Sequence, residues 1–276
     1  MTGNEAVKKI IEEVKKVIVG KDEVICQVMT ALVADGHILI DDIPGVGKTS
    51  LALAFSRAMA LNYNRVQFTP DVLPSDVTGF TMLNKKTNEF EFKQGAIMCN
   101  LFLADEINRT SSKTQSALLE AMEEGNVTVD SVTHKLMKPF NVIATQNPVG
   151  SIGTHMLPES QVDRFMFCVS MGYPLIKDEA KMLKEKYLKN PLDEINAIID
   201  GKGFEMIKEE VKKVFIHDDI YLYIAKIADV TRRLPEIELG ISPRGSVAIT
   251  KAAQANAYIE GRDYVIPDDV NKVLHP

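Results

Sequence analysis

The segment over residues 42–50, DIPGVGKTS, constrains this chain more than any other. It follows the apolar run HILI, which is typical of a short strand, and it precedes LALAFSRAMA, which has helical spacing. Gly45 and Gly47 allow a tight turn that points backbone N–H groups inward, and the following helix adds the positive end of its dipole. This order predicts a phosphate-binding loop that includes Pro44 and Val46.

The side chains at the end of this loop have the chemistry that a nucleoside triphosphate needs. The Lys48 ammonium can reach the terminal phosphates, the Thr49 hydroxyl stands where a Mg²⁺ ligand is required, and Ser50 is a further candidate contact. The usual pattern begins with glycine, where this chain has Asp42, so Pro44 and Gly45 supply alternative turn chemistry. We therefore expect ATP and Mg²⁺ to bind here.

Two further apolar runs end in polar side chains. The run NLFLA leads into Asp105 and Glu106, and FNVIATQ leads into Asn147. Open α/β sheets bind ligands at the carboxyl ends of their strands, so these residues are expected beside the phosphates. Asp105 is predicted to hold Mg²⁺ through its waters, and Glu106 to polarise the attacking water. The Asn147 amide can donate to the terminal phosphate or orient that water.

The first part of the chain has an α/β pattern. Apolar positions between residues 7 and 17 predict an amphipathic helix that ends near Gly20, and a second helix is expected over 22–33. Short apolar runs then alternate with helical patterns, which predicts a parallel sheet with helices on both faces. The segment NVTVDSVTHKL alternates around Asp130–Ser131 and predicts a projecting hairpin.

Beyond the turn at 172–174 the pattern becomes helical, with no convincing strand. We therefore divide the chain into a nucleotide-binding α/β core at 1–173 and an all-α domain at 174–276. The helices of the second domain are predicted at 178–189, 218–233, 243–260 and 267–274.

Composition narrows the partners and the compartment. The net charge is −6 with both signs interspersed, which does not favour a nucleic-acid partner, and no apolar run is long enough to span a bilayer. Cys26, Cys99 and Cys168 lie far apart in apolar stretches, which indicates buried free thiols in a reducing compartment. These features favour a cytoplasmic protein.

Taken together, these residues resemble the MoxR family of AAA+ ATPases. The resemblance covers nearly the whole chain and rests on PGVGKT, QFTPDVLPSDVTGF, FEFKQGAIMCNLFLADEINRTSSKTQSALLEAMEEGNVTV, ATQNP and LPESQVDRF. It implies an AAA+ core with an inserted element over roughly 71–95, a hairpin before the strand that carries Asn147, and a helical lid. The family also has an acidic residue at the first P-loop position, which accounts for Asp42.

The resemblance also assigns roles to residues outside the P-loop. Arg164 in LPESQVDRF matches the arginine that enters the neighbouring subunit's site. Arg244 in ISPRG matches the lid arginine, called sensor two, that touches the nucleotide phosphates. The segment VIVGKD suggests backbone contacts from Val19 and Gly20 to the adenine.

For function, the resemblance implies a homo-oligomer, expected as a hexameric ring, that hydrolyses ATP where subunits meet. Family members act as chaperone-like factors that mature, remodel or insert metal into a client protein, commonly alongside a protein with a von Willebrand factor A domain. The family usually continues beyond VLHP, so we expect the lid to lack its last helix.

Two other readings remain open from the sequence. One is a nucleic-acid motor or a magnesium-chelatase-type motor subunit, because both share the inserted element and the hairpin. The other is a nucleotide-regulated binding scaffold with little turnover, which the presence of Glu106 disfavours.

Overall fold

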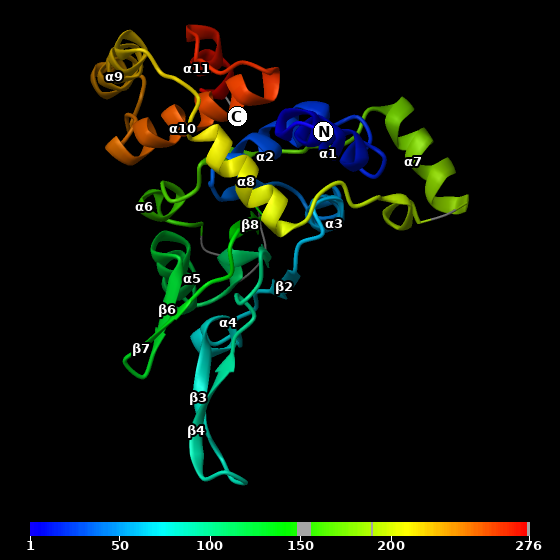
Figure 1. Cartoon of the computed structure of the whole chain (residues 1–276), viewed down its shortest axis with the longest axis vertical. Coiled ribbons are helices and arrows are strands. Elements are labelled where there is room, and N and C mark those ends of the chain that lie inside the picture. Colours follow the sequence, from blue (N-terminus) through cyan, green and yellow to red (C-terminus); the bar gives the residue numbers. More distant parts are fainter. Residues whose placement is uncertain (148–155, 189, 275–276) are drawn as a thin grey trace.

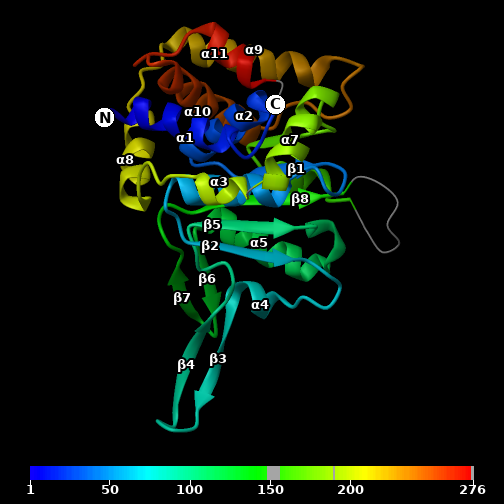
Figure 2. The same cartoon turned by 90° about the vertical axis from the view of Figure 1, so that its right-hand side faces the viewer.

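A five-stranded parallel sheet forms the centre of the computed structural model, which describes residues 1–147, 156–188 and 190–274 (Figure 1). The strand order is β2-β5-β8-β1-β9, and Figure 2 shows β2 and β5 side by side, running the same way. The strands are β1 (Ile38–Asp41), β2 (Tyr63–Gln67), β5 (Leu101–Asp105), β8 (Asn141–Gln146) and β9 (Phe167–Val169). The predicted parallel sheet is confirmed. Lys189, at the end of a predicted helix, Pro148 of ATQNP and the last two residues lie outside the described residues.

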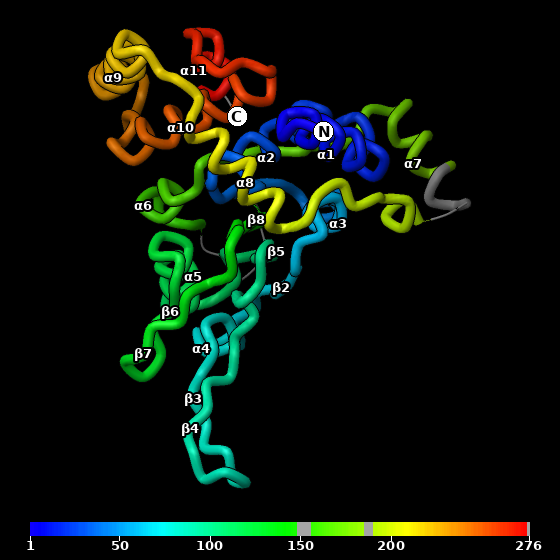
Figure 3. The backbone as a smooth tube through the Cα atoms, viewed as in Figure 1, coloured from blue at the N-terminus to red at the C-terminus, as the bar shows by residue number. Residues whose placement is uncertain are grey.

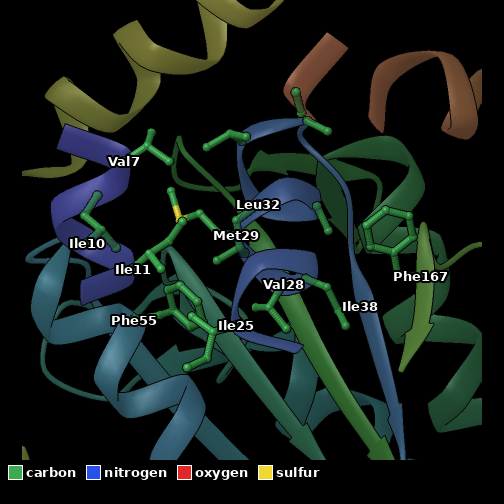
Figure 4. Close-up of a cluster of buried hydrophobic side chains, with 14 of the residues drawn as sticks. Val7, Ile10, Ile11, Ile25, Val28, Met29, Leu32, Ile38, Phe55 and Phe167 are labelled. Carbon is green, nitrogen blue, oxygen red and sulfur yellow. The ribbon is translucent and has the colours of Figure 1, made fainter. Parts of the chain in front are cut away.

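Helices cover both faces of the sheet because successive side chains of a strand point to opposite sides. Ile38 and Ile40 belong to the larger core, which also contains the apolar residues of α1, α2 and α3, whereas Leu39 between them belongs to the core with α5. Figure 4 shows the larger core, with Ile38 and Phe167 facing the helices. The helices are α1 (Gly3–Lys15), α2 (Asp22–Val33), α3 (Lys48–Ala58), α4 (Pro74–Thr78) and α5 (Ser112–Glu124).

The first helix is shorter than predicted. It begins with a capping box made by Thr2 and Glu5, and it ends at Lys15 instead of near Gly20. The backbone N–H groups of Val17 and Ile18 both donate to the carbonyl of Val14, which closes the helix in a tight turn. The second helix has the predicted bounds.

Two antiparallel hairpins project from the core. The strands β3 (Gly79–Asn84) and β4 (Glu89–Gln94) form a long hairpin that points away from the sheet, within the predicted inserted element (Figure 1). The predicted hairpin at Asp130–Ser131 is also present, as β6 (Asn126–Val129) and β7 (Val132–Lys135). Asp130 and Ser131 both have positive φ, as the tightest hairpin turns require.

The second part of the chain is helical, as predicted. The predicted bounds of α9 and α10 are confirmed, whereas α8 was not predicted. Phe204, Ile207 and Val211 have helical spacing, but the helix begins with GKG, a poor helix-forming start, and Lys208 occupies a buried position of its apolar face. The helices of this part are α7 (Ile176–Leu188), α8 (Gly201–Val211), α9 (Asp218–Arg233), α10 (Pro243–Glu260) and α11 (Pro267–Val273), with a short 3₁₀ turn at Pro191–Glu194. The first part of the chain also contains the short helix α6 (Glu159–Val162) and a 3₁₀ turn at Ile107–Arg109.

The helical part packs directly on the first two helices. Buried alanines of α10, including Ala252 and Ala253, allow it to lie against both α1 and α2, and they belong to the same core. The two chain ends consequently lie on the same side of the molecule (Figure 3). Among the helices of the described residues, none combines the length and apolar character needed to span a bilayer.

The cysteines are free, but only Cys99 is buried. The prediction of buried thiols is wrong for Cys26 and Cys168, which are exposed. Cys168 lies in the edge strand β9 between Phe167 and Val169, whose side chains point into the core, so its own side chain points outward.

Lys208 joins α8 to the sheet at Asn141, the first residue of β8. Its ammonium is buried and donates to Asp35 Oδ1 at 2.7 Å and to Asn141 Oδ1 at 2.9 Å. Burial lowers the pKa of Lys208, although the Asp35 carboxylate favours the charged form. The helical part is therefore tied to the core by a specific polar contact as well as by apolar packing.

We predict that Lys208→Ala lowers the free energy of unfolding by about 2–4 kcal/mol, because it leaves a cavity and an unpaired Asn141 oxygen. Urea unfolding followed by circular dichroism measures this change. Lys212→Ala is the control, since Lys212 pairs with Glu209 in an exposed ion pair and its loss should cost less than about 1 kcal/mol. Equal effects of the two changes would contradict the prediction.

Candidate nucleotide site

The P-loop has the geometry that its glycines predict. It follows β1, and Gly45 and Gly47 have φ values of 88° and 99°. A Cβ atom added at Gly45 would meet nothing within 4 Å, so the glycine is required for its backbone conformation and not for lack of space. Gly47 is the N-cap of α3, which begins at Lys48. The loop therefore ends on free N–H groups of a helix N-terminus, where anions bind.

Asp42 anchors the start of the loop. Its Oδ2 accepts hydrogen bonds from the backbone N–H groups of Met171 and Gly172 and from the Ser170 hydroxyl, while Oδ1 accepts from the N–H of Ile43. Burial alone would raise the pKa of this carboxyl, but these hydrogen bonds outweigh it and lower the pKa. The aspartate at the first P-loop position thus fixes the loop to the segment after β9.

Lys48 is a buried cation whose hydrogen bonds to described residues all go to neutral oxygens. Its ammonium donates to the Asp42 carbonyl at 2.7 Å and to Asn147 Oδ1 at 3.0 Å, and it forms no ion pair with any described residue. Burial lowers its pKa, which the nearby carboxylates of Asp105 and Glu106 only partly offset. An anion at the loop would supply the missing partner.

Asp105 ends β5 and is held from both sides. Its Oδ1 accepts from the Thr145 hydroxyl at 2.7 Å, and its Oδ2 accepts from Arg65 Nη2 at 2.6 Å and Nε at 3.2 Å. Parallel pairing brings Thr145 beside it, because Ala104 and Ala144 are partners in the register of β5 and β8. This carboxylate is nearly buried and fixed in orientation, as a metal-binding group should be.

Glu106 has a left-handed backbone conformation, with φ 58° and ψ 48°, which is uncommon for a residue with a side chain. Its Oε1 accepts from Asn147 Nδ2 at 2.9 Å and its Oε2 from Arg109 Nη1 at 2.7 Å. Burial would raise the pKa of Glu106, but these two donors lower it. The side chain is therefore an ionised carboxylate held next to Lys48 by a shared asparagine.

The same edge of the sheet suits a hydrated Mg²⁺. Thr49 follows Lys48 in the first turn of α3, next to Ser50, and both are half-buried. A threonine hydroxyl and a carboxylate are hard oxygen donors, and Mg²⁺ binds such donors while it keeps several of its waters. The residues present thus fit a site built on Thr49 and Asp105.

The segment predicted to cover the adenine lies beside the P-loop. Gly20 has φ 73°, and a Cβ atom there would meet the Asp178 carboxylate at the start of α7. The Ile18 side chain approaches to within 3.9 Å of the position that a Cβ of Gly47 would take. Val19, between them, is half-buried. Val19 and Gly20 thus follow a residue that lies against the P-loop, and their contact with the adenine stays a prediction.

Arg164 lies at the opposite edge of the sheet from Lys48. It precedes β9, and β9 runs parallel to β1 with Phe167 paired to Ile38, whereas Lys48 follows the other end of β1. Arg164 Nη1 donates to the Leu119 carbonyl at 3.1 Å and pairs with Glu123 Oε2 at 2.7 Å. The structure therefore does not bring Arg164 to its own P-loop.

Arg244 lies with Arg164 and not with the P-loop residues. Its Nη2 pairs with Glu123 Oε1 at 2.5 Å, and its Nη1 lies 3.8 Å from Asp163 Oδ2. Both arginines line one cavity of about 580 Å³ between α5, the end of α6 and the helix α10. The predicted site residues thus form two groups. The P-loop, Asp105, Glu106 and Asn147 lie at the carboxyl ends of the parallel strands, whereas Arg164 and Arg244 lie at the amino ends.

Sequence reasoning did not find several members of this site. Arg65 lies on β2, a strand with no buried residue and no alternation of apolar and polar residues that would have predicted it. Thr145 lies in β8, two residues before Asn147, so parallel register could have placed it beside Asp105. No sequence pattern indicated Arg109 or Glu123. Arg109 reaches Glu106 only because the chain turns between them, and Glu123 reaches its arginines only in the folded chain.

Comparisons with known proteins agree with this site. Residues 37–167 match the family described as "ATPase family associated with various cellular activities (AAA)", and residues 230–276 match the AAA lid domain. The first match contains the P-loop, the carboxylates of Asp105 and Glu106, and the neutral side chains of Thr145 and Asn147 that bond to them.

The relatives cover nearly the whole chain. Protein YeaC of Bacillus subtilis (strain 168) is 50% identical, with 95% of this chain and 82% of that protein aligned. Chaperone MoxR1 of Mycobacterium tuberculosis is 36% identical, with 97% and 73% aligned. A crystal structure from Cytophaga hutchinsonii, described as a candidate ATPase, has a TM-score of 0.90 at 37% identity and covers 98% of this chain and 85% of that one.

We predict that Asp42→Asn lowers the free energy of unfolding at neutral pH by about 1–3 kcal/mol, because an amide nitrogen replaces an oxygen that accepts buried N–H groups. The folded pKa of Asp42 is lowered, so its contribution is fully present above the usual aspartate range and is lost as the pH falls through the folded pKa. The deficit measured by urea unfolding should therefore shrink in acid.

The matched control is Asp41→Asn, which removes a neighbouring carboxylate whose buried Oδ1 has no partner among the described residues. This change should cost less at neutral pH. A deficit for Asp42→Asn that is no larger than the control, or that does not depend on pH, contradicts the anchoring role.

Proposed function

Because this chain belongs to the MoxR family of AAA+ ATPases, we propose that it hydrolyses ATP with Mg²⁺ at the joints between neighbouring copies of itself. The observation that carries the proposal is Lys48, a buried ammonium beside Asp105 and Glu106 that, among the described residues, is bonded to neutral oxygens alone. A cation in that setting requires an anionic ligand, and two adjacent carboxylates supply the groups that hydrolysis needs.

The P-loop binds the phosphates in this proposal. Backbone N–H groups from Gly45 to Gly47 and the start of α3 surround them, with Pro44 setting the turn, and Lys48 neutralises the terminal charge. Thr49 and Asp105 would hold Mg²⁺, which when bound neutralises charge on the phosphate oxygens. Ser50 adds a hydroxyl in the same helical turn.

Glu106 polarises the attacking water. Both of its oxygens already accept a hydrogen bond, from Asn147 and Arg109, but each has a second lone pair with which it can accept one from a water. Its lowered pKa keeps it ionised at neutral pH, which is the basic form that water activation needs. Asn147 accepts a hydrogen bond from Lys48 and donates one to Glu106. It therefore holds the base at a fixed place next to the lysine that binds the phosphates.

Arg164 and Arg244 serve the nucleotide of the neighbouring subunit. The support is their place beside each other at the edge of the sheet opposite their own P-loop. A chain with a phosphate site at one edge and two arginines at the other completes its sites by head-to-tail association, which closes into a ring. We propose a hexameric ring.

The wider role rests on the resemblance and on the relative named as a chaperone. We propose a core at 1–173 and a lid at 174–276 whose movement, coupled to hydrolysis, drives chaperone-like maturation, remodelling or metal insertion in a client protein. A protein with a von Willebrand factor A domain is the proposed companion, and the cytoplasm the proposed location. Capture of partners from a native lysate, with hydrolysis blocked by Glu106→Gln, tests this role.

We predict that Glu106→Gln retains Mg·ATP binding but slows turnover by about 10²-fold or more, since only the activation of water is lost. Lys48→Ala is the contrasting variant and should abolish binding, because the amides of the loop alone do not balance the triphosphate charge. Calorimetry and steady-state phosphate release measure the two properties separately. Turnover of Glu106→Gln within about threefold of wild type would assign water activation to another residue.

We predict that Arg164→Ala costs roughly 10³-fold in turnover with a far smaller change in ATP affinity. Subunits with this change keep an intact P-loop and Glu106, whereas Glu106→Gln subunits keep an intact arginine. Mixed oligomers should therefore recover activity that neither variant has alone, and recovery should depend on protein concentration. If sedimentation shows mixed oligomers that remain inactive, Arg164 does not act on a neighbour's site.

A further inference from the structure

We infer that Glu123 is a positioning residue that holds Arg164 and Arg244 together as one unit for the neighbouring subunit's nucleotide. The inference rests on the proposed function, because it assigns the way in which the two arginines are presented. It concerns a carboxylate that touches no P-loop residue and that acts only through the arginines.

The contacts of Glu123 are divided between the two arginines. Oε2 lies 2.7 Å from Arg164 Nη1, and Oε1 lies 2.5 Å from Arg244 Nη2. Two guanidinium groups this close repel each other, and one carboxylate between them offsets that repulsion. Loss of Glu123 would therefore restore the repulsion between the two cations and remove one ion pair from each of them.

The arginines come from different parts of the chain. Arg164 lies in the core just before β9, whereas Arg244 lies in the first turn of α10 in the helical part. Beside them, the Ser242 hydroxyl at the N-cap of α10 donates to Asp163 Oδ1 at 2.6 Å. Glu123 and Asp163 together thus dock the start of α10 on the core and set the distance between the arginines.

The place of Glu123 in its own helix is unfavourable without such a role. It lies in the last turn of α5, where the C-terminal end of the helix dipole is negative, and that turn has no basic residue. The carboxylate is also exposed, with 42% of its side chain accessible. Its favourable interactions are therefore tertiary, with the two arginines.

Fixing these side chains has a kinetic consequence. A free arginine side chain loses rotamer freedom on binding, and Glu123 removes part of that entropic cost before the neighbour's nucleotide arrives. Both arginines keep partly exposed side chains that face the cavity of about 580 Å³, so a neighbour can reach them. The carboxylate thus supplies orientation, and the arginines supply the charge.

The first test is the turnover of Glu123→Gln in the assembled full chain. We expect a loss of about tenfold in kcat, with the Kd for Mg·ATP of the isolated subunit unchanged within about threefold. Glu120→Gln is the matched control, since it removes the same charge from an exposed position of the same helix that forms no ion pair with a described residue. Unchanged or increased turnover of Glu123→Gln overturns the inference.

The second test asks whether the defect lies in the subunit that supplies the arginines to its neighbour. Glu123→Gln subunits keep their own nucleotide site, so an excess of Glu106→Gln subunits, which supply well-positioned arginines, should raise turnover per Glu123→Gln subunit about fivefold or more. A general folding defect in Glu123→Gln would not be rescued in this way. If Arg164→Ala is rescued by the same partner and Glu123→Gln is not, the inference is wrong and the proposed function stands. If Arg164→Ala is not rescued, the shared site itself fails.

Discussion

The parallel register of β1, β5 and β8 is the constraint on which the site depends. Parallel pairing places the carboxyl ends of these three strands at one edge, so the P-loop, Asp105 and Asn147 meet although they are far apart in the chain. Because of this register, the Thr145 hydroxyl makes two hydrogen bonds to the end of β5: it donates to Asp105 Oδ1 and accepts from the Glu106 N–H. A slip of one residue between β5 and β8 would point Thr145 to the other face and release both acidic residues.

The same register separates the two halves of the proposed active site. Residues that precede the parallel strands lie at the edge opposite the P-loop, and Arg164 is one of them. Since α10 packs on α1 and α2, the start of that helix brings Arg244 to this second edge as well. The P-loop and the two arginines of one chain therefore lie at opposite ends of the parallel strands, which is why the proposed site needs a second copy to complete it.

Much of the fold and half of the site could be predicted from the sequence, because those features depend on local chemistry. The P-loop, the carboxylates after an apolar strand and the bounds of α9 and α10 need only spacing and caps. The helix α8 was missed because Lys208 takes a position that an apolar residue normally fills. The Arg65–Asp105 and Arg244–Glu123 pairs could not be predicted, since each joins segments that only the folded chain brings together.

The distribution of ion pairs at the site also explains how a triphosphate can enter it. Asp105 and Glu106 each have an arginine partner within the chain, Arg65 and Arg109, so these carboxylates are partly neutralised before any ligand binds. Lys48, in contrast, bonds to a carbonyl and an amide, and its burial disfavours the charged state. An incoming phosphate therefore gains an ammonium that has no ion pair with a described residue, and meets weaker repulsion from the carboxylates than two bare acids would exert.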